Sequence, residues 1–155
     1  MFNPVVTVSL LMVKAIRWER AIHTIFAQLF ASIFASLVVS GILPGPLLVV
    51  TKLDPDMSIA RGLFLEMFLT AQLVLIILML PASSNKPMYI GLTLFVAEIC
   101  GVYFTGGSLN PARSFGPAVV AGFTSYQWIY WLGPLLGAGL GGAVFSLFDF
   151  LKIDR

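Results

Sequence analysis

The chain has 155 residues, of which 59% are hydrophobic and 10% are charged, and its formal net charge is +2. Soluble domains carry about 25% charged and about 45–50% apolar residues, so this composition indicates a membrane protein. The small, dispersed net charge argues against a nucleic-acid partner. One cysteine (Cys100) and one histidine (His23) exclude an internal disulfide and a cysteine or histidine metal cluster. We therefore expect no metal and no cofactor.

Apolar segments follow one another along most of the chain. Residues 5–13 come first and are too short to span a bilayer, which takes about 20 apolar residues. Residues 21–43, 59–80 and 88–104 each approach or reach that length. Residues 118–123 are again short, and residues 126–151 form the last long segment. We predict an all-α, multi-pass integral membrane protein with four spanning helices in a lipid bilayer.

Each short segment follows an Asn-Pro pair, Asn3-Pro4 or Asn110-Pro111. Asparagine is a good N-cap and proline suits the first helical position, so each pair is expected to start a helix. Irregular backbone survives at membrane depth only where it is buried in protein or lines a water-filled cavity. The repeat therefore predicts two re-entrant half-helices around a pore, a design known from inverted-repeat transporters.

Basic residues set the expected orientation. Six of them fall before, between and after the spans on one side: Lys14, Arg17, Arg20, Lys86, Lys152 and Arg155. The positive-inside rule assigns this side, and with it the C-terminus, to the cytoplasm. We expect the protein in the plasma membrane, with an internal membrane as the alternative.

Residues 106–118 (GGSLNPARSFGPA) resemble the second signature loop of the aquaporin (major intrinsic protein) family. Asn3-Pro4-Val5 resembles the first signature, with Val5 where alanine is usual, and residues 129–134 are similar to fungal members. The resemblance implies one aquaporin-like domain over residues 1–155, with pore loops at residues 1–14 and 105–123. The family plan also implies two further spanning helices ahead of Asn3.

The resemblance assigns the pore residues. Asn3 and Asn110 become the pore asparagines, in loops that also contain Pro4, Val5, Pro111 and Ala112. Two helix N-termini facing each other at mid-membrane would repel cations, since each carries roughly half a positive charge. We interpret valine at position 5, in place of alanine, as a change in side-chain packing rather than a change in function.

The selectivity filter implied by the family consists of Arg113, Glu98 and Gly107. Glu98 lies where water-selective members carry histidine. Two states are open for it: an ionised carboxylate bridged to Arg113, which we favour, or a neutral donor that resembles the histidine.

Other positions match the water-type pattern, namely Ser114, Ala118, Tyr130 and Trp131. Glu66 matches the family glutamate that accepts backbone N–H groups from a pore loop, and Gln28 is expected to hold a loop as well. The implied function is a passive, orthodox water channel that assembles as a homotetramer. Alternatives are a channel for glycerol or another small neutral solute, and a non-conducting membrane protein that assembles with full-length relatives. Nothing in the sequence indicates an enzyme or catalytic residues.

Overall fold

The structure is a computed structural model that describes residues 1–152. Six α-helices make up most of this part of the chain, and it contains no strand. They are α1 (Pro4–Met12), α2 (Trp18–Ile42), α3 (Ile59–Met79), α4 (Lys86–Thr105), α5 (Pro111–Ala121) and α6 (Ile129–Phe150). Together they form the all-helical bundle that the sequence predicts.

Four of these helices, α2, α3, α4 and α6, are long and apolar enough to cross a membrane. They match the four predicted spans, with shifted ends. α2 begins at Trp18 and α4 extends to Thr105, beyond the predicted limits. α6 begins later than predicted, at Ile129, because a turn precedes it, in which the Ile129 N–H donates to the Tyr126 carbonyl (3.1 Å). Hydropathy records composition and does not detect such a turn.

The two short helices begin at the Asn-Pro pairs, as predicted. Asn3 and Asn110 are the N-caps of α1 and α5, and a proline follows each of them. The predicted apolar segment 118–123 covers only the end of α5, which starts at Pro111. The first turns of α5 include the polar residues Arg113 and Ser114, so a count of apolar residues does not detect where the helix begins.

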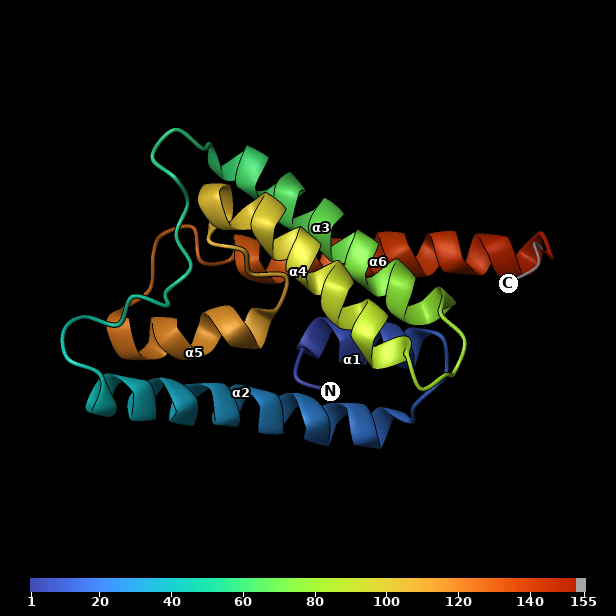
Figure 1. Cartoon of the computed structure of the whole chain (residues 1–155), viewed down its shortest axis with the longest axis horizontal. Helices are drawn as coiled ribbons and strands as arrows, with labels where there is room; N and C mark the ends of the chain where they lie inside the picture. Colours follow the sequence, from blue (N-terminus) through green and yellow to red (C-terminus); the bar gives the residue numbers. More distant parts are fainter. Residues whose placement is uncertain (153–155) are drawn as a thin grey trace.

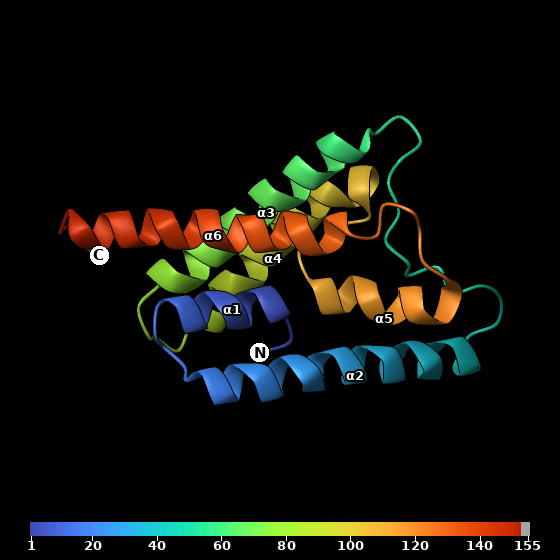
Figure 2. The same cartoon turned by 180° about the vertical axis from the view of Figure 1, so that it is seen from behind.

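The two half-helices lie end to end with their N-termini facing each other (Figures 1 and 2). α2 runs alongside both of them, and α3 packs between α4 and α6. Small residues allow α6 to lie directly on α3: a Cβ on Gly141 would come within 2.8 Å of the Ala71 carbonyl oxygen, and one on Gly133 within 2.9 Å of the Leu63 oxygen. Small residues at such positions are typical of closely packed helices in membranes.

The loops are divided between the two ends of the bundle as the distribution of basic residues predicts. The α1–α2 turn, the α3–α4 turn and the end of α6 lie at one end of the bundle, on the right in Figure 1. The α2–α3 and α5–α6 loops lie at the other end. Of the six residues used for that prediction, Arg155 lies outside the described residues.

Candidate functional site

The two asparagines form a reciprocal pair where the half-helices meet. The Asn3 side-chain amide donates to the Leu109 carbonyl oxygen (2.8 Å), and the Asn110 amide donates to the Phe2 carbonyl oxygen (3.0 Å). Each asparagine is therefore bound to the residue that precedes the other. This exchange ties the two loops together with the symmetry of a repeat.

The same two side chains cap the helices they precede. Asn3 Oδ1 accepts from the Val5 N–H (2.9 Å), and Asn110 Oδ1 accepts from the N–H groups of Ala112 (3.0 Å) and Arg113 (3.3 Å). Since the carboxamide oxygen points into its own helix, the NH2 group is left to face outward, and each NH2 has a second N–H to offer. Both positive helix ends lie at this junction.

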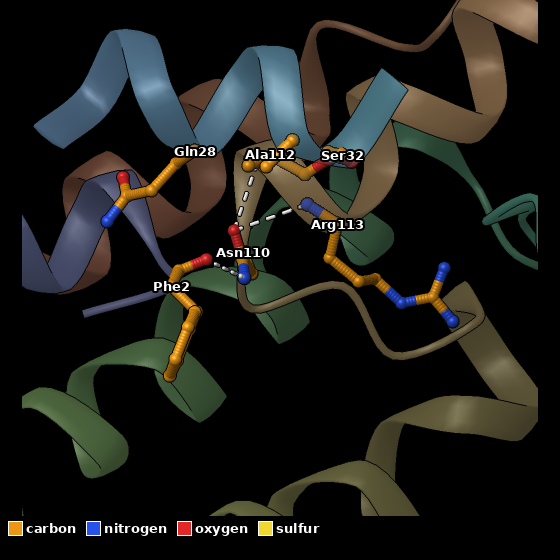
Figure 3. Close-up of a pocket in the computed structure, with 7 residues that line it drawn as sticks. Phe2, Gln28, Ser32, Asn110, Ala112 and Arg113 are labelled. Atoms are coloured by element: carbon orange, nitrogen blue, oxygen red, sulfur yellow. Dashed lines mark hydrogen bonds between the residues drawn. The ribbon is translucent and has the colours of Figure 1, made fainter. Parts of the chain in front are cut away.

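Arg113 lies in the first turn of α5 and is half-buried. Its Nη1 donates to the Val49 carbonyl oxygen in the α2–α3 loop (2.7 Å). Figure 3 shows the guanidinium extending away from Asn110. An arginine has five N–H donors in a planar fork, so this one bond leaves others for a passing molecule.

The predicted bridge between Glu98 and Arg113 does not form. The two side chains make no salt bridge in the described structure, and the Arg113 guanidinium binds the Val49 carbonyl instead. That part of the sequence hypothesis is wrong, because a sequence pattern does not reveal a competing backbone carbonyl from a distant loop.

Glu98, Asn110 and Arg113 nevertheless surround one cavity of about 280 Å³. Asn3 and Ser108 complete its polar lining, and the remaining wall is apolar, formed by Phe2, Val6, Leu73, Ile77, Ile90, Leu94 and Leu109. A second cavity of about 260 Å³ lies between α2 and the junction and shares Phe2, Asn110 and Arg113 with the first (Figure 3). The structure thus places both asparagines and two of the three predicted filter residues on the wall of the first cavity.

Gly107, the third predicted filter residue, lies against Glu98 in the loop before Asn110. Its φ of +55° is in the left-handed region, which favours glycine. A Cβ added to Gly107 would overlap the Glu98 carboxylate. The Glu98 carboxylate therefore occupies the space that a side chain at position 107 would take.

Glu66 supports this loop from α3. The carboxylate is fully buried, and Oε1 accepts from the Thr105 hydroxyl (2.7 Å) and the Ser108 N–H (2.9 Å), while Oε2 accepts from the Leu109 N–H (2.8 Å). Buried backbone donors are costly to leave unpaired. A single carboxylate thus fixes the backbone next to Asn110.

Gln28 contacts the other half-helix. Its Nε2 donates to the Thr7 hydroxyl in α1 (3.0 Å), and Thr7 in turn donates to the Asn3 carbonyl oxygen (3.1 Å). Gln28 also lines the second cavity. Val5 is fully buried and packs with Val74 and Ala138, so its extra methyl groups fill the core.

The four residues of the water-type pattern lie behind the second loop. Ser114, Ala118 and Tyr130 are fully buried. The Tyr130 hydroxyl donates to the Thr105 carbonyl oxygen (2.8 Å), and the Ser114 hydroxyl is hydrogen-bonded to that of Ser108. Trp131 packs edge-on against Phe115, with ring centroids 5.7 Å apart. The hydrogen bonds of Tyr130 and Ser114 help to position the backbone of the second pore loop.

Sequence reasoning missed three contacts at this site. Val49 binds Arg113 through its carbonyl oxygen, and Ser32 in α2 donates to the Ala112 carbonyl oxygen. The Gln127 amide donates to the Ser114 carbonyl oxygen (3.2 Å). Ser32 and Gln127 are polar residues near apolar segments, and this position could have indicated that their side chains form hydrogen bonds within the protein. Val49 gave no such indication, because only its backbone takes part.

Comparison with known proteins shows which family has this architecture. Residues 1–145 match the family model described as Major intrinsic protein. The chain is 51% identical to Aquaporin-7 of Botryotinia fuckeliana over 160 residues, a match that covers 99% of this chain and 35% of that protein. It is 48% identical to Probable aquaporin-3 of Gibberella zeae over 162 residues, which covers 100% of this chain and 57% of that protein.

Among solved structures, the fold is similar to that of the aquaglyceroporin from Plasmodium falciparum, with a TM-score of 0.72 and 22% sequence identity. That match covers 95% of this chain and 70% of the other. The chain spans from about a third to just over half of the curated relatives described above. On the family match and these identities, the chain belongs to the major intrinsic protein family.

Proposed function

We propose that this chain forms the pore region of a passive channel that conducts water across a membrane, with residues 1–14 and 105–123 as its pore loops. The observation that carries the proposal is the reciprocal pairing of Asn3 and Asn110 at the junction of two helix N-termini, beside a cavity that Arg113 also lines. The names of the aquaporin relatives support it.

The chemistry of this junction suits water. Each asparagine has an amide N–H beyond the one that holds the opposite loop, and Arg113 has further N–H donors. A water molecule that passes can therefore replace hydrogen bonds lost from bulk water. Two positive helix ends and a guanidinium at one constriction raise the energy of a cation there, so we expect neutral molecules to pass and cations to be excluded.

The filter allows a second candidate, a channel for glycerol or another small neutral solute. Gly107 leaves no side chain of its own in the filter, and the cavity combines an apolar wall with polar groups. Such an amphipathic lining also suits a small polyol. We further propose a homotetramer in the plasma membrane with a cytoplasmic C-terminus, as the family resemblance and the distribution of basic residues indicate.

Reconstitution tests the proposal. The 155-residue chain and the longest reading frame that contains it are each inserted into liposomes, and shrinkage after an osmotic step is followed by light scattering. At least one preparation should shrink faster than empty liposomes, and Asn110→Ala should abolish the gain. A glycerol gradient separates the two candidates, since re-swelling follows only if glycerol enters.

Two results would count against the channel. One is a shrinkage rate equal to that of empty liposomes for both preparations, with insertion verified. The other is flux that appears only when a conducting relative is co-inserted, which would favour a non-conducting assembly partner.

A further inference from the structure

A row of large apolar side chains runs along the outer surface of α2, and we call it the α2 ridge. Its members are four residues apart, so they form one inclined row on the helix. Each is between 44% and 70% exposed: Trp18, Ile22, Phe26, Phe30 and Phe34. In both views of the fold α2 lies along one edge of the bundle, so its outer surface has no other helix over it (Figures 1 and 2).

A different side of α2 carries small residues. Thr24, Ala27, Ala31 and Ala35 line the cavities between this helix and the rest of the bundle. Contacts between membrane helices are enriched in small residues, because these let two backbones approach closely. The α2 ridge contains none, so its side chains favour lipid over another helix as their neighbour.

Basic side chains gather at the N-terminal end of the α2 ridge. Lys14, Arg17 and Arg20 are all exposed, and with Glu19 they give this short segment a net charge of +2. Arg17 Nη2 pairs with Glu19 Oε1 (2.8 Å), whereas Lys14 and Arg20 form no salt bridge within residues 1–152. Two cations therefore remain for an anion from outside the chain.

We propose that this segment and the α2 ridge bind an anionic phospholipid. The headgroup pairs with Lys14 and Arg20, and an acyl chain lies along Trp18, Ile22 and Phe26. From Trp18 to Phe26 the helix rises about 12 Å, close to the ~15 Å that one leaflet contributes to the hydrocarbon core. Tryptophan is typical of the level where headgroups begin. In the orientation proposed above this is the cytoplasmic leaflet, which carries anionic lipids.

Fluorescence quenching tests the site in a bilayer. The 155-residue chain is reconstituted in phosphatidylcholine vesicles that contain either brominated phosphatidylserine or brominated phosphatidylcholine, since bromine quenches a tryptophan that it contacts. The signal of Trp18 is obtained by subtracting that of Trp18→Phe, which retains Trp128 and Trp131 near the start of α6. The anionic lipid should bind at least about fivefold more tightly, because one basic residue near an anionic surface contributes about that factor.

A pair of double variants locates the site. Lys14→Gln with Arg20→Gln should remove the preference for the anionic lipid. Lys52→Gln with Arg61→Gln is the matched control: both residues are exposed, and they lie in the α2–α3 loop and the first turn of α3, at the other end of the bundle. This control removes the same charge and should keep the preference.

Glu19→Gln should change binding in the opposite direction. It frees Arg17 from its ion pair, so the preference for phosphatidylserine should increase.

Four results would overturn the proposal. Two of them are equal quenching by both lipids in the parent and a preference that survives the double variant at the ridge. A third is an equal loss of preference in the control, since the charge of the whole chain would then explain it. The fourth is no quenching of Trp18 by either lipid, which would show that another protein chain covers the ridge. No flux is measured, so the outcome does not depend on the channel function.

Discussion

Glu66 should contribute more to the stability of the second loop than any other single side chain described here. It accepts three hydrogen bonds at 2.7–2.9 Å, from the Thr105 hydroxyl and the N–H groups of Ser108 and Leu109, at a site with no solvent exposure. Glu66→Ala leaves the Ser108 and Leu109 N–H groups buried without an acceptor, whereas the Thr105 hydroxyl can still donate to the Gly101 carbonyl oxygen (3.2 Å). At about 1–3 kcal/mol for each of the two orphaned groups, the loss of folding free energy is about 2–6 kcal/mol.

The Glu66→Gln substitution keeps the size and shape of the side chain but removes one of its two acceptor oxygens. A carboxamide has one oxygen, so its NH2 group must face either the Leu109 N–H or the pair formed by Thr105 and Ser108. With either choice, one backbone N–H loses its acceptor, and the loss should be about half of that in Glu66→Ala. The predicted order of stability is parent, then Glu66→Gln, then Glu66→Ala.

Thermal unfolding in detergent, followed by tryptophan fluorescence, measures this order. At about 2–4 °C per kcal/mol for a chain of this size, Glu66→Ala should lower Tm by at least about 4 °C. Thr70→Val is the matched control: Thr70 is one turn further along α3, fully buried, and its hydroxyl has no hydrogen-bond partner in the described structure. Its replacement should leave Tm unchanged or raise it. A Tm for Glu66→Ala equal to that of Thr70→Val would refute the reasoning.

Three further changes test other parts of the site. Asn110→Asp keeps the helix cap but loses the amide that donates to the Phe2 carbonyl, so cation leakage in proteoliposomes should rise; unchanged exclusion of cations would contradict this. Thr7→Val removes the partner of the buried Gln28 amide and should lower stability by about 1–3 kcal/mol in the same thermal assay, whereas an unchanged Tm would show that α1 is held elsewhere. Cys100 is exposed on α4, so we expect mercurials to inhibit the parent only weakly and Cys100→Ser to leave water flux unchanged; strong inhibition of the parent that this variant abolishes would show that Cys100 reaches the pore.

The sequence predicts the framework of this molecule because its signals are local. Apolar length identifies the four spans, and each Asn-Pro pair identifies a capped helix start. Spacing from Asn110 predicts that Glu98 and Arg113 belong to one filter, and the structure puts both side chains on the wall of one cavity. These inferences need only the residue and its neighbours along one helix.

The contacts that hold the site together are not local, and most involve the backbone. Arg113 binds a carbonyl of the α2–α3 loop, 64 positions earlier in the chain, and this contact displaces the ion pair expected with Glu98. Every residue except proline has the same backbone N–H and carbonyl, so no residue type reveals which of them will accept. The packing of Glu98 against Gly107 depends likewise on how a loop folds back on its helix.

Leu109 shows how far such backbone contacts extend. From the sequence it is one apolar residue among many, yet its φ of +48° is uncommon for a residue that carries a side chain, and it is fully buried. Its N–H donates to Glu66, and its carbonyl oxygen accepts from the Asn3 amide. The buried carboxylate that fixes the second loop therefore also fixes the acceptor to which the first loop is bound. Glu66 is thus linked to both asparagines through this one residue, and one carboxyl group in α3 helps to position both halves of the junction.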